Sequence, residues 1–333
     1  MKRKFAGIIT IILFYSLASG AKGNFEVQKN QKINTKVKTE ITLLNEKVYK
    51  LLGQSDYKTL KTLFSDSLLK YVPQEFETKF MPQLSGVIKG KEHRILDEFY
   101  IKNQQLDSPV TVEGGEGDQA YTFQLMTSQK ETFVTLMAAG DTNNEVMITL
   151  VYTNINNNWK LSILRGEDYS LFGQNAVDIF HHAHMLRETG DIVDAYNFMN
   201  VASHYLNPGG SFFKYNLFDH ISEYQDTLNF ENNANFAMPY KVEQLKTKPE
   251  IFNIHLELLD GRLTPMIVYL SKIYVKDTMA LKAENEEFNA KIGTIFTSMD
   301  KNNKAIIYRA YNEKPSGQNS PKYYGFVKRR DQK

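Results

Sequence analysis

The stretch ETFVTLMAAGDTNNEVMITLVYTNINNNWKLSILR, residues 131–165, decides the fold. Apolar and polar side chains alternate along 131–139, 145–153 and 158–165, and β-branched and aromatic residues are frequent, which is typical of strands. The turns GDTNN and NINNN supply Gly and Asn, which tolerate the positive φ angles of tight hairpins. Because short turns join antiparallel neighbours, the stretch predicts an antiparallel meander.

Upstream of this meander, the period of the apolar residues becomes that of helices. In KTEITLLNEKVYKLLG (38–53), apolar side chains recur every three or four residues, and Gly53 can end the helix. Ser55 or Asp56 can cap a second helix, because the side-chain oxygen of either residue can accept a hydrogen bond from a free helical N–H. A third short helix is expected within FETKFMPQLSGVI (76–88).

The same meander is expected to begin with two further strands, RILDEFYIK (94–102) and AYTFQLMT (120–127). Helices followed by an antiparallel meander give the order of an α+β domain, which we place at residues 36–170.

Residues 38–168 resemble the nuclear-transport-factor-2-like superfamily, also called steroid-isomerase-like or SnoaL-like. The likeness is carried by the helix break GQSDYKTLKTLFSDSLLKY and by the closing strand NNWKLSIL, which contains Trp159 after a polar hairpin. The resemblance implies that the N-terminal helices pack on a strongly curved antiparallel sheet, forming a cone that encloses a pocket. The superfamily contains both enzymes and non-catalytic modules, and no catalytic motif of its enzymes is matched, so the resemblance implies no residue roles.

The first residues, MKRKFAGIITIILFYSLASGAKGN, have the pattern of a secretory signal peptide. A basic start precedes the apolar run Phe5–Ala18, which is shorter than the about 20 residues needed to span a bilayer. We expect residues 1–20 to be removed near Gly20–Ala21, and 21–35 to be a loose leader. No later stretch is apolar enough to span a membrane, so the mature chain is expected to lack a transmembrane segment.

Downstream of the cone, residues 174–207 read as two helices around Gly190, a helical hairpin connector. Residues 210–333 alternate strand patterns with the charged segment TMALKAENEEFNAKI (278–292), and we expect a final hairpin turning at DKNN (300–303). The sequence therefore predicts a small C-terminal antiparallel α+β domain.

Composition excludes several classes of function. The chain contains no cysteine, so disulfides, thiol chemistry and Cys-based zinc sites are excluded. Its net charge is +2 with no extended basic block, which argues against a nucleic-acid partner. No phosphate loop, nucleophile elbow, dinucleotide fingerprint or EF-hand loop is present, and we expect no cofactor.

The segment VDIFHHAHMLRETGD (177–191) contains three histidines within four positions. At helical spacing, His181, His184 and Glu188 fall on one strip, and two imidazoles with a carboxylate could hold zinc or iron. Alternatively, the strip borders an apolar face that includes Phe180, and its histidines simply pack at a helix–helix seam.

Asp97 and Glu98 are the candidate catalytic residues. If the face that Asp97 shares with Phe99 lines the cone, burial raises the pKa of Asp97 and suits it to general acid or base catalysis. Glu98 takes that place if the register is reversed. Alternatively, the face is solvated, or Asp97 bonds to an Arg or Tyr.

Aromatic side chains are concentrated in the same strands. They would line a pocket for a small apolar or aromatic ligand, or they would simply fill the cone. The set is Phe99, Tyr121, Phe123, Phe133, Tyr152 and Trp159.

Together these features predict a secreted or periplasmic, non-catalytic module that binds a small ligand or a protein of the cell envelope. Two alternatives remain open. One is a pocket enzyme, an isomerase or hydrolase that uses Asp97 or Glu98. The other is metal binding through His181 and His184.

Overall fold

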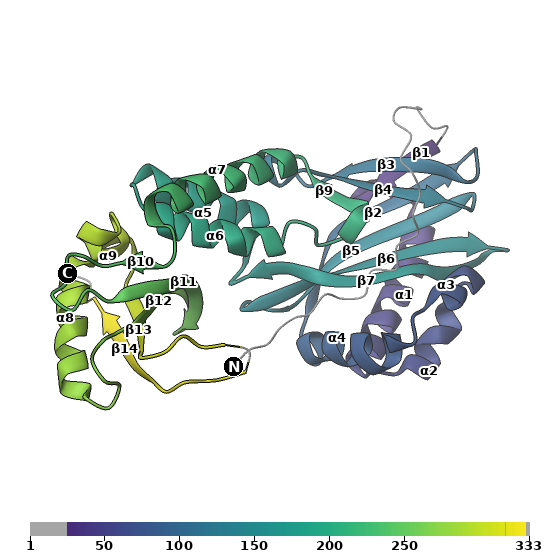
Figure 1. Cartoon of the computed structure of the whole chain (residues 1–333). Helices are drawn as coiled ribbons and strands as arrows, with labels where there is room; N and C mark the ends of the chain where they lie inside the picture. Colours follow the sequence, from purple (N-terminus) through teal and green to yellow (C-terminus); the bar gives the residue numbers. More distant parts are fainter. Residues whose placement is uncertain (1–24, 317, 331–333) are drawn as a thin grey trace. The chain divides into compact units, whose positions relative to one another are not determined.

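The computed structural model describes residues 25–316 and 318–330 (Figure 1). The described chain forms two compact units. The first contains residues up to Asn175 together with His204–Phe218, and the second contains Ala176–Ser203 and the residues from Asp219 onward. The expected signal peptide and its cleavage site lie outside the described residues. No helix within the two described ranges is long and apolar enough to cross a membrane.

The first unit is built on a strongly curled, six-stranded antiparallel half-barrel, sheet A. The strands, in sheet order, are β1 (Phe25–Lys29), β2 (His93–Asn103), β5 (Glu131–Asp141), β6 (Asn144–Ile155), β7 (Asn158–Leu171) and β8 (Gln174–Asn175). The register shifts once between β2 and β5 and twice between β6 and β7, and such bulges bend a sheet. The predicted α+β class and the curved antiparallel sheet are confirmed.

Short helices cover one face of sheet A (Figure 1). The helices and single turns of this unit are η1 (Asn30–Lys32), α1 (Thr35–Gly53), α2 (Tyr57–Leu60), η2 (Lys61–Leu63), α3 (Asp66–Tyr71), η3 (Phe76–Phe80), α4 (Met81–Ile88), η4 (Gly117–Gln119) and η5 (Gly210–Phe212). Asp56, not Ser55, caps α2 by accepting a hydrogen bond from the Thr59 N–H at 3.0 Å. The side chains that face these helices form a row across four strands: Tyr100, Phe133, Tyr152 and Leu161.

A separate three-stranded sheet, sheet B, adjoins the other face of sheet A. It consists of β3 (Ser108–Gly114), β4 (Tyr121–Thr127) and β9 (Phe213–Tyr215). The prediction that 120–127 belongs to the meander is therefore wrong. β3 and β4 pair with each other along seven residues, which leaves β2 free to pair directly with β5.

The described part of the segment expected to be a loose leader, residues 25–35, differs from that prediction. Residues Phe25–Lys29 form β1, which pairs with β2, and Asn34 caps α1 by accepting hydrogen bonds from two N–H groups. Because β1 is an edge strand held by backbone hydrogen bonds, it needs no continuous apolar face, and its mixed sequence FEVQK gives little signal.

The second unit packs helices on a five-stranded sheet, sheet C. Its elements are α5 (Ala176–Glu188), α6 (Ile192–His204), α7 (Phe218–Phe236), β10 (Tyr240–Lys241), β11 (Glu250–Leu259), β12 (Arg262–Leu270), α8 (Thr278–Ile295), α9 (Met299–Asn302), β13 (Ala305–Tyr311) and β14 (Tyr323–Arg329). The two helices expected within 174–207 are present as α5 and α6. The helix α7 was not expected, because its surface is polar and few of its side chains are buried.

Sheet C is mixed, whereas the sequence predicted an antiparallel domain. Three of its strand pairs are antiparallel, but β12 and β13 are parallel. The reason is the connection between them: α8 carries the chain from the end of β12 back to the start of β13, as a parallel pair requires. The expected hairpin turn at 300–303 is wrong, because Met299–Asn302 forms α9.

Candidate functional site

Asp97 is buried within a set of hydrogen-bond donors. Its side chain lies between the two sheets of the first unit, and the residue is 5% exposed. One carboxylate oxygen accepts a hydrogen bond from Asn30 Nδ2 at 2.7 Å and lies 3.2 Å from the Lys29 ammonium. The other accepts from the Tyr121 hydroxyl at 2.6 Å and from the Gly115 N–H at 3.1 Å.

These donors reverse the expected shift in the pKa of Asp97. Burial alone would raise the pKa of this carboxyl, as the sequence predicted. The hydrogen bonds from Tyr121, Asn30, Gly115 and Lys29 outweigh burial and hold the pKa below its usual value. Asp97 is therefore an ionised, fully bonded carboxylate, and the prediction of a raised pKa is wrong.

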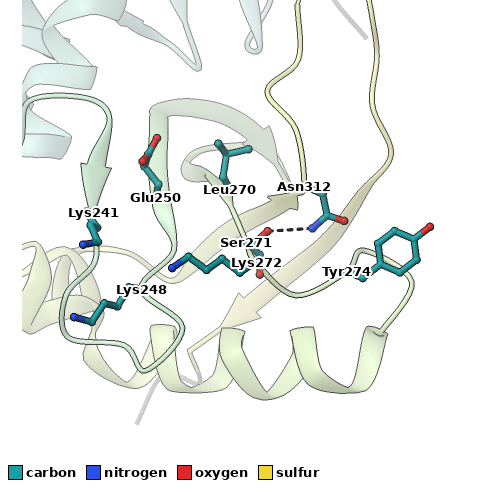
Figure 2. A pocket seen from close by; sticks show the side chains of 8 residues that line it. All are labelled: Lys241, Lys248, Glu250, Leu270, Ser271, Lys272, Tyr274 and Asn312. Atoms are coloured by element: carbon teal, nitrogen blue, oxygen red, sulfur yellow. Dashed lines mark hydrogen bonds between the residues drawn. The ribbon is translucent and has the colours of Figure 1, made fainter.

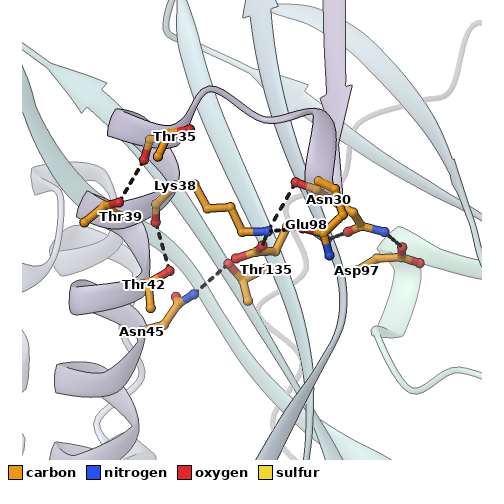
Figure 3. A network of polar contacts seen from close by, with 10 residues as sticks. Asn30, Thr35, Lys38, Thr39, Thr42, Asn45, Asp97, Glu98 and Thr135 are labelled. Atoms are coloured by element: carbon orange, nitrogen blue, oxygen red, sulfur yellow. Dashed lines mark hydrogen bonds and ion pairs between the residues drawn. The ribbon is translucent and has the colours of Figure 1, made fainter.

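Glu98 is fixed on the opposite face of β2, as Figure 3 shows. The residue is 4% exposed, and its Oε2 lies 3.2 Å from the ammonium of Lys38 on α1. The side chain of Asn30 joins the two acidic residues, because its Oδ1 accepts from the Glu98 N–H at 2.8 Å while its Nδ2 donates to Asp97. Both candidate catalytic residues thus hold the first unit together.

A second polar contact links α1 to the centre of sheet A (Figure 3). Asn45, 2% exposed, donates to Thr135 Oγ1 at 3.1 Å and accepts from the Tyr152 hydroxyl at 2.9 Å. Both the amide nitrogen and the amide oxygen of Asn45 are hydrogen-bonded to the sheet. Hydrogen bonds as well as apolar packing therefore hold α1 on this face of sheet A.

The six predicted pocket aromatics do not gather in one place. Phe133, Tyr152 and Trp159 belong to the core between the helices and sheet A. The remaining three, Phe99, Tyr121 and Phe123, lie outside that core. Tyr121 stacks on Phe213 at 4.3 Å and Phe123 on Phe212 at 5.9 Å, both within the sheet B region.

Burial also separates these rings from any ligand. Five of the six, all except Trp159, are at most 6% exposed. The rings therefore pack against neighbouring side chains and offer almost no surface to a bound molecule. Of the two expectations for the cone, filling by its own rings agrees with this arrangement.

The histidines of α5 pack against aromatic rings. Phe180 contacts the rings of His181 and His184 at 5.2 and 6.4 Å, and His184 stacks on Tyr224 at 5.5 Å. His184 Nδ1 lies 3.6 Å from Glu188 Oε1, and both side chains are largely exposed. Among the described residues, no three His, Cys, Asp or Glu side chains gather so as to hold a metal. The expected zinc or iron site is not formed.

A cleft of about 730 Å3 lies at one end of sheet C (Figure 2). Three register neighbours on adjacent strands contribute to it: Lys241 of β10, Glu250 of β11 and Leu270 of β12. The loops after β10, β12 and β13 supply the other lining residues. These are Lys248, Ser271, Lys272, Tyr274 and Asn312.

The lysines dominate the charge of this cleft. Lys241 and Lys248 share a single carboxylate, Glu243, at 2.6 and 2.7 Å, and their hydrogen bonds lower the pKa of Glu243 to about 2. Lys272 has no carboxylate partner among the described residues. In the view of Figure 2, the ammonium groups of the three lysines lie toward the same side, while the Glu250 carboxylate points away from them.

Asn312 holds the loop that presents Lys272. Its amide donates to the backbone carbonyls of Ser271 and Ile273 at 3.0 and 2.6 Å, and its oxygen accepts from the Val275 N–H at 2.7 Å. The loop is thus fixed by three bonds from one side chain, and Tyr274 stands out from it, 61% exposed. Because the wall of this positively charged cleft is already ordered, binding of an anion does not lose the conformational entropy of the loop.

The sequence reasoning missed this cleft. Its signal was a set of lysines in two loops, YKVEQLKTKPE and SKIYVK, that lie about 30 residues apart and flank strands of one sheet. Only the pairing of β10, β11 and β12 brings the loops together.

Comparison of the chain with protein-family models, with curated proteins and with solved structures finds no match.

Proposed function

We propose that the protein is a non-catalytic binding module and that the cleft of its second unit binds an anionic ligand. The observation that carries the proposal is Lys272. Its ammonium group lies at a fixed cleft beside Lys241 and Lys248 and has no carboxylate partner within the described residues. A phosphate or carboxylate group of a ligand would supply that partner.

The state of Asp97 supports binding over catalysis. A general acid or base must reach a substrate and exchange a proton near neutral pH. Asp97 is buried and bonded on both oxygens, and its pKa lies below the usual value. Its environment is that of a structural carboxylate.

The proposal also includes a cellular location and a family, and both are based on the sequence alone. The basic start and apolar run of residues 1–20 support export to the periplasm or out of the cell, with cleavage near Gly20–Ala21. The helix break and closing strand within 38–168 support a nuclear-transport-factor-2-like scaffold. Because the aromatic rings of the cone are buried, we place the ligand at the lysine cleft, where it is either a small anion or an acidic group of an envelope protein.

The test is calorimetric titration of the protein with pyrophosphate and with citrate at low ionic strength. We expect at least one anion to bind, with an affinity that falls as salt is added. Lys272→Glu should weaken binding about tenfold or more, equivalent to about 1.4 kcal/mol, because it replaces an attractive charge by a repulsive one. The matched control is Lys276→Glu, which makes the same charge change outside the cleft lining.

Equal weakening by Lys272→Glu and Lys276→Glu would show that only the overall charge attracts the anion, and would overturn the assignment to the cleft. Absence of binding by both anions to the wild-type protein would overturn the proposed function itself.

A further inference from the structure

Helix α8 turns two polar side chains toward sheet C. Glu284 and Asn285 are 4% and 0% exposed, and they lie beside Tyr269 of β12, which is also 0% exposed. Burial, and then the charge of the Glu284 carboxyl, raises the pKa of the Tyr269 hydroxyl, and the Asn285 amide acts on the same hydroxyl. The three groups therefore occupy one place within the second unit, under the first half of α8.

These groups do not satisfy one another. Both oxygens of Glu284, both polar atoms of Asn285 and the Tyr269 hydroxyl lack a partner with hydrogen-bond geometry among the described residues. Buried polar groups are almost always hydrogen-bonded, and an unpaired buried carboxylate is among the least favourable groups a fold can contain. Asp97 shows the usual solution, with four donors around one carboxylate.

Three basic side chains on α8 or on and after β14 contact other residues of the second unit. Lys291 contacts Glu287 at 2.8 Å, and Lys328 pairs with Glu286. Arg330 donates to Asn289 at 3.3 Å. Within the described chain, no Lys or Arg side chain forms an ion pair with Glu284.

Carboxylate, amide and phenol oxygens are the ligands that hard metal cations prefer. We propose that Glu284, the Asn285 amide oxygen and the Tyr269 hydroxyl bind a small metal cation inside the second unit. The ligand set contains one carboxylate, that of Glu284, and two neutral groups. This charge balance favours a singly charged ion, sodium or potassium. The site is separate from the proposed anion cleft and does not depend on it.

The test is the melting temperature of the full chain in sodium, potassium, magnesium and calcium chloride. Each is compared with choline chloride at equal ionic strength, because choline is too large for a buried oxygen site. A bound cation stabilises only the folded state, so at least one metal should raise the melting temperature by about 2 °C or more, increasing with concentration. Glu284→Gln should abolish that difference between the metal salt and choline.

Two further variants keep the test decisive. Glu286→Gln removes an exposed carboxylate from the same helix and should retain the full response to the metal. If Glu284→Gln does not fold, Tyr269→Phe removes one oxygen only and should weaken the response. Equal melting temperatures in all five salts, or a response that survives in Glu284→Gln, would overturn the proposal.

Discussion

The two units bury carboxyl groups in opposite ways. In the first unit, Asp97 and Glu98 are 5% and 4% exposed, and each lies 3.2 Å from a lysine ammonium. In the second unit, Asp191 and Asp194 are 1% and 0% exposed, and their side-chain donors are neutral asparagines. Carboxyls at similar depth therefore lie beside a lysine in the first unit and accept from neutral side-chain donors in the second.

The difference shows that, at similar burial, the partners decide the direction in which the pKa of a carboxyl shifts. Donors hold the pKa of Asp97 below its usual value. The pKa of Asp194 is raised well above the usual value, first by burial and then by the neighbouring charge of Asp191. Asp194 accepts a hydrogen bond from Asn303 through Oδ2, while its Oδ1 has no partner among the described residues. The pKa of Asp191 is raised as well, chiefly by burial.

The largest expected effect is that of Asp97→Asn. In the variant, an amide NH2 group faces donors that in the wild type bond to a carboxylate oxygen, such as Asn30 or Tyr121. The variant also leaves the Lys29 ammonium without its carboxylate partner. We expect the free energy of unfolding at pH 7 to fall by about 2–4 kcal/mol, measured by urea denaturation.

The dependence of this loss on pH follows from the lowered pKa. A carboxyl with a lowered folded-state pKa stabilises the fold above its unfolded pKa, near 3.8, and the stabilisation disappears as the pH falls through the folded value. The difference between wild type and Asp97→Asn should therefore shrink in acid. Glu113→Gln, an exposed carboxylate on β3, is the matched control. A variant as stable as the wild type at pH 7 would contradict the partnered state of Asp97.

Asp194→Asn should have the opposite sign and a smaller effect. The amide oxygen can keep the bond from Asn303, and the residue no longer loses a proton inside the fold. We expect the free energy of unfolding at pH 7 to rise by about 1 kcal/mol, again by urea denaturation.

Here the pH dependence is reversed. A group whose pKa is raised in the folded state stabilises fully below its unfolded pKa, and this contribution is lost as the pH rises through the folded value. Asp194→Asn and wild type should therefore converge in acid and diverge toward neutral pH. The exposed Asp226→Asn on α7 serves as control. Destabilisation by Asp194→Asn at pH 7, with no gain at any pH, would mean that an ionised Asp194 has a partner.

Much of the fold followed from the sequence, because its strands and helices repeat their apolar residues with the right periods. The stretch 131–165 gave β5 and β6 nearly to their ends and the first part of β7, and Gly53 marked the end of α1. The parts that failed depend on tertiary pairing. β1 is held by backbone bonds to an edge, and the parallel pair β12–β13 depends on where α8 returns the chain.

The candidate site was harder to predict from the sequence, because it too depends on tertiary contacts. Asp97 was correctly singled out as a buried carboxyl, and a bond to a Tyr was one of its stated alternatives. The alternation of a strand cannot show that Asn30 and Gly115, far away in sequence, supply further donors and so reverse the pKa shift. Nor can the alternation show that the aromatic side chains of neighbouring strands lie on opposite faces of the sheet. Phe133 of β5 faces the helices, whereas Phe99 of β2 does not.

Glu188→Gln should change the free energy of unfolding least of all. It extends the comparison of buried carboxyls to one that is exposed to water. Glu188 is 67% exposed on its side chain, and its contact with His184 is 3.6 Å long. It is also the last residue of α5, where a negative charge is slightly unfavourable near the end of the helix. The loss of a weak exposed pair and the relief at the helix end should nearly cancel, so the free energy of unfolding should change by less than about 0.5 kcal/mol. Zinc chloride should leave the melting temperature of both proteins unchanged. A loss above about 1 kcal/mol would mean that Glu188 has a partner of the kind that Asp97 has, and that exposure is a poor guide to which carboxyls matter in this protein.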